Sequence, residues 1–388
     1  RMREGVAVIQ QDVGAYVAEI RGRGFLLGLD FDLAGHGVEI PLTHVIDLAN
    51  VGNMDASLAA LSDKERRRFI DQFGDVAEPV VYLEQEVEGI GGERILLEVH
   101  GIMRTTDFFE QSLRRRNFDA LNEVRSAVSL AARRGSAVAG LGQFTSIVSS
   151  NGLLVKDYGP AITTGNSLTA GFAFETLLKA LHARGVELGE CRVGVVGAAG
   201  NICNVLAQLI GDNAKALTLV HRSGDDATRR MLNAKGRILA ESRIDASSVR
   251  VSSNVADLAD CDAIILGTST TEILITPEIL KRDAVIIDIS VPSNVDPAVF
   301  LQRPDVAAYH GALAQLPNSQ SLATDWLPRP RGQVYACLAE TITLGFSGHV
   351  GHFSLGQLRK SQVVEVLQLA GRVGLEMGRP VPLRMRSH

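Results

Sequence analysis

The residues from Arg192 to Ser223 predict a strand, a glycine-rich turn, a helix and a second strand, an order that strongly constrains the fold. A run of β-branched residues ends at Gly197, apolar residues then recur at helical spacing, and residues 216–220 return as a strand. Glycines in such a turn let the backbone approach a pyrophosphate, which N–H groups at the helix start can bind. The stretch predicts a doubly wound, Rossmann-type α/β domain that binds a dinucleotide; the alternative is a strand-turn-helix without a ligand.

The turn has the spacing G-x-x-G, and Cys203 stands where a third glycine would let the helix pack closely on the strand. We expect packing against a strand to explain Cys203. The turn residues predicted to bind the cofactor are Gly197, Ala198, Ala199, Gly200, Asn201 and Ile202.

The residues after the second strand indicate which dinucleotide is bound. An NAD enzyme is expected to place Asp or Glu there for the ribose 2′-hydroxyl, whereas this chain has His221, Arg222 and Ser223. A cation and a hydroxyl suit a 2′-phosphate. We therefore predict NADPH as the cofactor, with Arg222 and Ser223 at its phosphate.

Composition excludes several classes of protein. A net charge of -5 argues against a nucleic-acid partner, and no apolar run is long enough for a membrane span or marks a signal peptide. The four cysteines are widely spaced, which predicts reduced thiols in a cytoplasmic protein without a metal site. The closest histidine pair, His349 and His352, is expected to be structural or to line the substrate cleft.

The length predicts several domains, because a single core rarely extends over so many residues. We expect an N-terminal extension, an α/β substrate domain, a Rossmann-type NADP-binding domain and C-terminal helices. Their expected ranges are 1–40, 41–165, 166–320 and 321–388.

The substrate domain is expected to mix strands and helices. Residues 80–88 and 94–100 alternate around a Gly-Gly turn, which predicts a hairpin. Other expected elements are a strand at 43–50, a helix from Ser62, helices at 107–116 and 118–134, and a strand at 141–148.

A helix is expected from Ile162 to about Arg184, with Thr164 and Asn166 as capping residue types. Because this stretch immediately precedes the nucleotide fold, contact with substrate or nicotinamide is an alternative role. The residues assigned to the cleft on this side are Phe144, Thr145, Thr164, Gly165 and Asn166.

The second half of the nucleotide sheet is expected from buried apolar runs at 249–253, 262–268 and 284–290, separated by helices, and a last strand at 305–311. Thr268 and Ser290 end two of these strands, at the sheet edge that binds ligands, and are predicted to contact the cofactor. Asn294 is assigned to the cleft. A loop at 317–332 and helices at about 333–346 and 358–377 are expected to follow.

Cys337 is the residue that can carry covalent chemistry. A bare cysteine on an apolar helical face is more often a small buried hydrophobe. Two features favour a nucleophile instead: Cys337 lies near a helix start, where the dipole stabilises a thiolate, and Glu340 follows one turn later. With NADPH, these residues predict thiolate attack on an acyl thioester and hydride reduction to an aldehyde. Donors expected at the reacting oxygen are Thr164, Ser290 and Asn294.

Several motifs together resemble cyanobacterial long-chain acyl-ACP reductases, in order over most of the chain. They are residues 141–147 (LGQFTSI), 163–169 (TTGNSLT), 195–202 (VVGAAGNI), 335–340 (YACLAE) and 348–356 (GHVGHFSLG). The resemblance implies NADPH-dependent reduction of fatty acyl-ACP, and less well acyl-CoA, to an aldehyde through an acyl-cysteine at Cys337. The chain departs from the family at Cys203 and at His349 and His352, where the family has an aromatic residue and an asparagine.

Residues 21–31 (RGRGFLLGLDF) resemble the closing segment of class III aminotransferases; an ordinary hairpin is the alternative. The resemblance suggests a chain cut from a longer fusion, in which the aldehyde released from a carrier protein is passed to a fused or neighbouring aminotransferase. No complete aminotransferase fits in this segment, so no pyridoxal chemistry is expected.

Two other functions remain open from the sequence. Residues 288–297 are similar to glutamyl-tRNA reductase, but that family has its nucleophile before the nucleotide domain, and here no cysteine precedes Cys191. The second alternative is a non-catalytic NADP-binding scaffold.

Overall fold

The structure, a computed structural model, describes residues 41–48, 65, 74, 78–270, 272–290, 293–323 and 330–383. Backbone contacts divide the chain into two units. The first contains Arg1–Gly165, Pro317–Gly332 and Glu340–Gly356, and the second contains Asn166–Leu316, Gln333–Ala339 and Gln357–His388. The aminotransferase-like segment and most of the helix expected from Ser62 lie outside the described residues.

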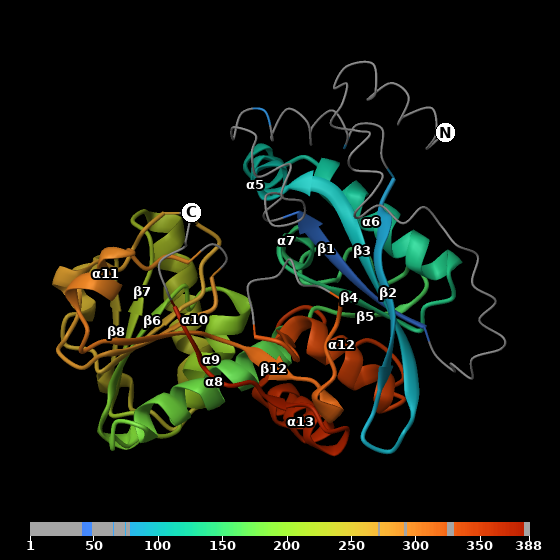
Figure 1. Cartoon of the computed structure of the whole chain (residues 1–388). Helices are drawn as coiled ribbons and strands as arrows, with labels where there is room; N and C mark the ends of the chain where they lie inside the picture. Colours follow the sequence, from blue (N-terminus) through green and yellow to red (C-terminus); the bar gives the residue numbers. More distant parts are fainter. Residues whose placement is uncertain are drawn as a thin grey trace. The chain divides into compact units, whose positions relative to one another are not determined.

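The first unit is built on a five-stranded sheet in the order β2-β3-β1-β4-β5 (Figure 1). The expected hairpin is confirmed, since β2 and β3 pair antiparallel, while β1 lies parallel to both β3 and β4. The strands are β1 (Pro41–Leu48), β2 (Val80–Glu88), β3 (Arg94–Thr105), β4 (Val138–Leu141) and β5 (Ala161–Thr163).

Helices α5 (Thr106–Arg115) and α6 (Asp119–Arg133) pack on this sheet and bury one apolar core. The strand expected at 141–148 is wrong, because β4 ends at Leu141 and α7 (Phe144–Val148) follows. Gln143 has a φ of 55°, which breaks the strand. The hydroxyl of Thr145 donates to the carbonyl of Gly142 at 2.5 Å, so local side-chain bonds favour the helical turn over the β-branched pattern.

The second unit holds a seven-stranded sheet in the order β15-β11-β10-β9-β6-β7-β8, which confirms the predicted Rossmann-type fold. Six of its strands run parallel, and only β15 is antiparallel at the edge. These strands are β6 (Arg192–Val196), β7 (Ala216–Val220), β8 (Val249–Ser252), β9 (Ala263–Leu266), β10 (Val285–Asp288), β11 (Ala307–His310) and β15 (Val381–Pro382).

Helices connect only part of this sheet. The first three strands are joined by α9 (Asn201–Gly211) and α10 (Asp225–Glu241), as expected, and α8 (Asn166–His182) and α11 (Ala298–Gln302) precede β6 and β11. The helices expected on either side of β9 are instead the short 3₁₀ turns η5 (Val255–Leu258) and η6 (Pro277–Ile279). The predicted helix at 162–184 also begins late, because Ala161–Thr163 pairs with β4 as strand β5.

The C-terminal part contains more strand than expected. Gln333–Tyr335 is strand β13, which pairs with β12 (Leu313–Gln315), so α12 (Ala336–Phe346) begins three residues later than predicted. Cross-strand pairing overrides the helical pattern here, and Gln333 is buried opposite Gln315. Helix α13 (Lys360–Arg372) is followed by β14 (Glu376–Met377) and β15, so two helices alone do not end the chain.

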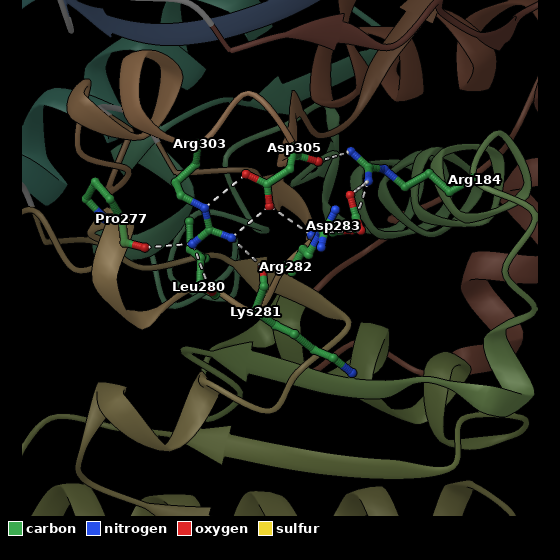
Figure 2. A network of polar contacts seen from close by, with 8 residues as sticks. All are labelled: Arg184, Pro277, Leu280, Lys281, Arg282, Asp283, Arg303 and Asp305. Atoms are coloured by element: carbon green, nitrogen blue, oxygen red, sulfur yellow. Dashed lines mark hydrogen bonds and ion pairs between the residues drawn. The ribbon is translucent and has the colours of Figure 1, made fainter.

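A polar network fixes the loops that enter β10 and β11 (Figure 2). The guanidinium of Arg303 donates to both carboxylate oxygens of Asp305, at 3.0 and 2.8 Å. It also donates to the carbonyls of Pro277, Leu280 and Lys281. Hydrogen bonding from Arg303 lowers the pKa of Asp305 well below its usual range. Side-chain hydrogen bonds therefore stabilise the amino ends of β10 and β11, opposite the carboxyl edge where dinucleotides bind in such sheets.

Among the described residues, no helix is long and apolar enough to cross a bilayer. In the same part of the chain, no group of histidine, cysteine and acidic side chains is arranged to hold a metal ion.

Candidate functional site

The glycine turn after β6 has a conformation that only glycine accepts. Gly197 has a φ of 88°, and a Cβ atom there would strike the carbonyl oxygen of Gly267. Gly200 is the N-cap of α9 and donates its N–H to the carbonyl of Gly197 at 2.8 Å. A glycine at the N-cap lets a pyrophosphate group approach the backbone at the helix start.

Cys203 is a packing residue next to this turn. Its side chain is buried, with the sulfur 3.7 Å from the carbonyl oxygen of Gly267. A Cβ atom on Gly267 would collide with that sulfur, so the space that a third turn glycine normally leaves is supplied by a glycine on the facing strand end. Burial, and to a smaller extent the charge of Asp288, raise the pKa of the Cys203 thiol to about 12.

Other predicted turn residues are held by the chain itself. The carbonyl of Ala198 accepts a hydrogen bond from the side-chain amide of Asn204 at 3.0 Å. The side-chain oxygen of Asn201 accepts the N–H of Leu358 at 2.9 Å. Ala199 and Ile202 are half-buried. The turn is therefore braced from α9 and from the segment before α13.

Arg222 and Ser223 lie exposed just after β7, which is the strand beside β6. Val196 and Val220 are paired at the ends of these strands, so the cation and the glycine turn share one sheet edge. No described residue forms an ion pair with Arg222. Its guanidinium is available to a phosphate group.

The loops after β9 and β10 bring three predicted site residues together. The N–H of Thr268 donates to the hydroxyl oxygen of Ser290 at 3.1 Å, and the hydroxyl of Thr268 donates to the side-chain oxygen of Asn294 at 2.7 Å. Both hydrogens of the Asn294 amide are used, on the carbonyls of Thr270 and Glu272. Asn294 therefore stabilises the loop, and both of its side-chain donors, which were expected at a substrate oxygen, are occupied.

Asp288, at the end of β10, organises these loops and was not predicted. Its carboxylate accepts the hydroxyl of Ser293 at 2.7 Å and the N–H groups of Ser290 and Asn294 at 2.8 and 3.1 Å. Burial raises the pKa of Asp288, while these hydrogen bonds act in the opposite direction. An acidic residue that ends an apolar strand and precedes Ser and Asn was the available sequence signal.

Cys337 differs from the other cysteines in its exposure. It is the second residue of α12 and is half-buried, whereas Cys191, Cys203 and Cys261 are buried. Burial raises the pKa of the Cys191 and Cys261 thiols to about 11. Thiolate formation is therefore disfavoured in the three buried cysteines, and Cys337 is the most exposed of the four.

Glu340 lies one turn after Cys337 on α12 and is fully buried. The hydroxyl of Thr163, at the end of β5, donates a hydrogen bond to a carboxylate oxygen of Glu340. Thr163 is fully buried as well and was not among the predicted site residues. The strand end and the helix are joined through this bond.

Residues 352–354 run beside β5 and bind it through three hydrogen bonds. The hydroxyl of Thr164 donates to the carbonyl of Ser354 at 2.7 Å. The N–H of Ile162 donates to Nδ1 of His352 at 2.9 Å, and the N–H of Phe353 donates to the carbonyl of Ile162 at 2.9 Å. Thr164 and His352, both assigned to the cleft, are thus brought together. Because Nδ1 accepts, the neutral His352 ring carries its proton on Nε2.

The remaining cleft residues have mixed surroundings. The His349 ring meets Phe353 edge-on at 5.2 Å, and its buried Nε2 has no hydrogen-bond partner among the described residues. Phe144 packs into the apolar core of the first unit. Gly165 has a φ of 70°, and Asn166 begins α8.

Comparison with known proteins supports the fold of the second unit. A family profile for shikimate/quinate 5-dehydrogenases matches residues 179–310, which are 132 of the 388 residues. This region contains the glycine turn and strands β6 to β11. A solved shikimate 5-dehydrogenase from Listeria monocytogenes has a TM-score of 0.36 and 8% identity over 73% of this chain and 89% of that one.

A long-chain acyl-[acyl-carrier-protein] reductase from Synechococcus elongatus is 27% identical over 350 residues, covering 83% of this chain and 95% of the relative. The predicted resemblance to acyl-ACP reductases is confirmed. Aminotransferase PigE from a Serratia species is 28% identical over 257 residues, which are 65% of this chain but only 29% of PigE. The chain is thus a homologue of an acyl-ACP reductase, with a nicotinamide-binding domain of the oxidoreductase type.

Proposed function

We propose that this chain reduces an acyl thioester to an aldehyde with NADPH, through an acyl-enzyme intermediate on Cys337. The observation that carries the proposal is the placement of Cys337, which is half-buried in the first turn of α12 while the other three cysteines are buried. The curated name of the Synechococcus elongatus relative, an acyl-ACP reductase, supports the substrate class.

In the first step the Cys337 thiolate attacks the carbonyl carbon of the thioester. A new carbon–sulfur bond to Cys337 forms, the bond to the carrier sulfur breaks, and the carrier leaves as a thiolate that takes a proton from solvent. The start of α12 favours this reaction, because the positive end of the helix dipole stabilises a thiolate in the first turn.

When bound, NADPH supplies the hydride that reduces the acyl carbon. The tetrahedral oxyanion then collapses, the bond to the Cys337 sulfur breaks, and the aldehyde leaves while the thiolate is regenerated. Glu340 is the proposed partner of this cysteine on α12, where its buried carboxylate orients a neighbouring group or relays a proton. Thr163 holds that carboxylate in place.

The residues proposed to hold NADPH lie along one edge of the second unit's sheet. Gly197 and Gly200 let the backbone of the turn approach the pyrophosphate, and N–H groups in the first turn of α9 are proposed to bind it. Arg222 and Ser223 bind the 2′-phosphate, which is what distinguishes NADPH from NADH. Thr268 and Ser290 belong to the loops on the other side of the turn.

The proposed acyl donor is a carrier protein, with acyl-CoA as the second choice, and the aldehyde is proposed to pass to an aminotransferase. The match to PigE spans 257 residues, so it extends well beyond the aminotransferase-like residues 21–31. A curated aminotransferase thus contains a long segment similar to this chain. Aldehyde release followed by transamination in one chain or one pathway accounts for that combination.

Single-turnover mass spectrometry tests the proposal. The protein is incubated with an acyl-pantetheine or acyl-carrier protein without NADPH, and we expect an acyl adduct on Cys337 that disappears as aldehyde forms once NADPH is added. Cys337→Ala should form no adduct, while Cys261→Ala should behave as the unmodified chain. If no adduct forms with any acyl length while NADPH still binds, the covalent mechanism is wrong and a non-catalytic NADP-binding role is favoured.

A further inference from the structure

The strand order of the second unit changes direction between β6 and β9. The chain moves outward through β6, β7 and β8, then returns to the other side of β6 and continues through β9, β10 and β11. Ligands of open α/β sheets bind at the carboxyl ends of strands where the direction changes in this way. The glycine turn at Gly197 and the strand end at Gly267 meet at this point, since a Cβ on Gly197 would strike the Gly267 carbonyl oxygen.

Two loops on the β9 side are joined into one layer by side chains. Asn294, from the loop after β10, accepts the hydroxyl of Thr268 and donates to two carbonyls in the loop after β9. Asn294 is fully buried. The loop after β9 therefore takes its conformation from the position of Asn294.

The position of Asn294 depends in turn on Asp288. The Asp288 carboxylate accepts the N–H of Asn294 and the hydroxyl of Ser293, and its other oxygen accepts the N–H of Ser290. Ser290, Ser293 and Asn294 all donate to Asp288, so a carboxylate, which only accepts, satisfies all three. An asparagine side chain in its place would direct its own NH₂ group at one of these donors. Asp288 is 2% exposed, so its carboxylate is surrounded by these protein donors and not by solvent.

We propose that Asp288 is a positioning residue for the cofactor: through Ser290, Ser293 and Asn294 it sets the two loops that receive the nicotinamide half of the dinucleotide. The adenosine half is assigned to a different part of the edge, at the glycine turn and Arg222. The inference rests on the cofactor assignment of the proposed function, but not on the acyl-cysteine chemistry.

Because the two halves of the dinucleotide are assigned to different residues, binding measurements can distinguish a role of Asp288 in positioning the cofactor from a role in the stability of the whole fold. Dissociation constants are measured by fluorescence or calorimetry for NADPH, which carries both halves, and for 2′,5′-ADP, which carries only the adenosine half. Asp288→Asn is expected to weaken NADPH binding by about 10-fold or more, while 2′,5′-ADP binding changes less than about twofold, since the lost bonds involve a charged group.

Asp262→Asn is the matched control. Asp262 also has a carboxylate that accepts a backbone N–H, that of Arg192 at 2.8 Å, but it precedes β9 at the opposite edge of the same sheet. Neither ligand should respond to it. Equal weakening of both ligands by Asp288→Asn, or no change in either, would overturn the proposal.

A milder variant covers the case in which Asp288→Asn does not fold. Ser293→Ala removes one donor to Asp288 and should weaken NADPH binding about 2- to 5-fold without affecting 2′,5′-ADP. An equal effect on both ligands, or none, again overturns the inference. If NADPH binds in this selective manner but Cys337 never forms an adduct, the proposed function fails and the role of Asp288 stands; if the unaltered chain binds neither ligand, both fail.

Discussion

The hydroxyl of Thr163 donates a hydrogen bond to a carboxylate oxygen of Glu340, and both side chains are fully buried. Thr163 ends the short strand β5, whereas Glu340 lies on α12 one turn after the proposed nucleophile. A carboxylate in the interior is held by the donors around it, because desolvation otherwise favours its neutral form. The strand end therefore fixes the position of the Glu340 side chain.

Replacing Thr163 with valine keeps the shape of the side chain and removes this donor. We expect the free energy of unfolding to fall by about 1–3 kcal/mol, because the buried Glu340 side chain loses a hydrogen-bond partner. The rate of acyl-Cys337 reduction should fall as well. Denaturant titration and single-turnover kinetics measure the two effects. Thr163→Ser retains the hydroxyl and should restore most of both; equal behaviour of the serine and valine variants would contradict the role given to the hydrogen bond.

Alkylation should distinguish Cys337 from the other thiols. Burial raises the pKa of Cys191 and Cys261 to about 11 and that of Cys203 to about 12, so their thiolates are scarce near neutral pH. With iodoacetamide at about pH 7.5, near or below an ordinary thiol pKa, Cys337 should be modified first in the folded protein. Peptide mass mapping at several times follows each site. In denaturant all four should react at similar rates, and early labelling of a buried cysteine without denaturant would refute the assignment.

The contact between Cys203 and Gly267 predicts a coupled pair of substitutions. Gly267→Ala places a methyl group against the Cys203 sulfur and should destabilise the fold by about 1–3 kcal/mol through overpacking. The double variant Cys203→Gly and Gly267→Ala removes the side chain on α9 and adds a methyl group at the end of β9. It should therefore recover part of the lost stability. Thermal unfolding of the single and double variants gives the coupling energy. Additive losses would show that the two residues do not share this space.

The nucleotide-binding half could be predicted because its determinants are local. Gly197 and the apolar runs that end in polar residues predict a parallel sheet and its ligand-binding edge. These signals can be read without knowing which distant residues are in contact. The presence of strands β6 to β11 and the placing of Thr268 and Ser290 at one sheet edge follow from these signals.

The errors occur where distant residues determine the conformation. Gln333 fits a helical pattern but pairs as a strand with Gln315, and Ile162 does the same with Ala139. Thr163 could not be recognised because its partner Glu340 is 177 residues away in the sequence. Asp288 was missed for a different reason: its role depends on three donors that a loop brings around it.

Stability at acid pH should depend on Glu98 in the first unit. Burial raises the pKa of this carboxyl, but hydrogen bonds from His100 and Arg134 outweigh burial and leave the pKa below its ordinary value. A lowered folded-state pKa stabilises the fold above the unfolded pKa of about 4.3 and ceases to do so as the pH falls through the folded value. Thermal midpoints from about pH 7 to 3 should fall less steeply for Glu98→Gln than for the unaltered chain. Parallel curves would exclude Glu98 as the source.

Arg222 should determine the choice between NADPH and NADH. The exposed guanidinium after β7 is the proposed partner of the 2′-phosphate, which only NADPH carries. Arg222→Ala is therefore expected to weaken NADPH binding by about 10- to 100-fold and to leave NADH binding within about twofold, because a charge-assisted bond to phosphate is lost. Arg282→Ala, whose side chain is 90% exposed before β10 at the opposite sheet edge, is the control and should change neither constant. An equal loss for both cofactors would place Arg222 outside the 2′-phosphate site and require another cation to make that contact.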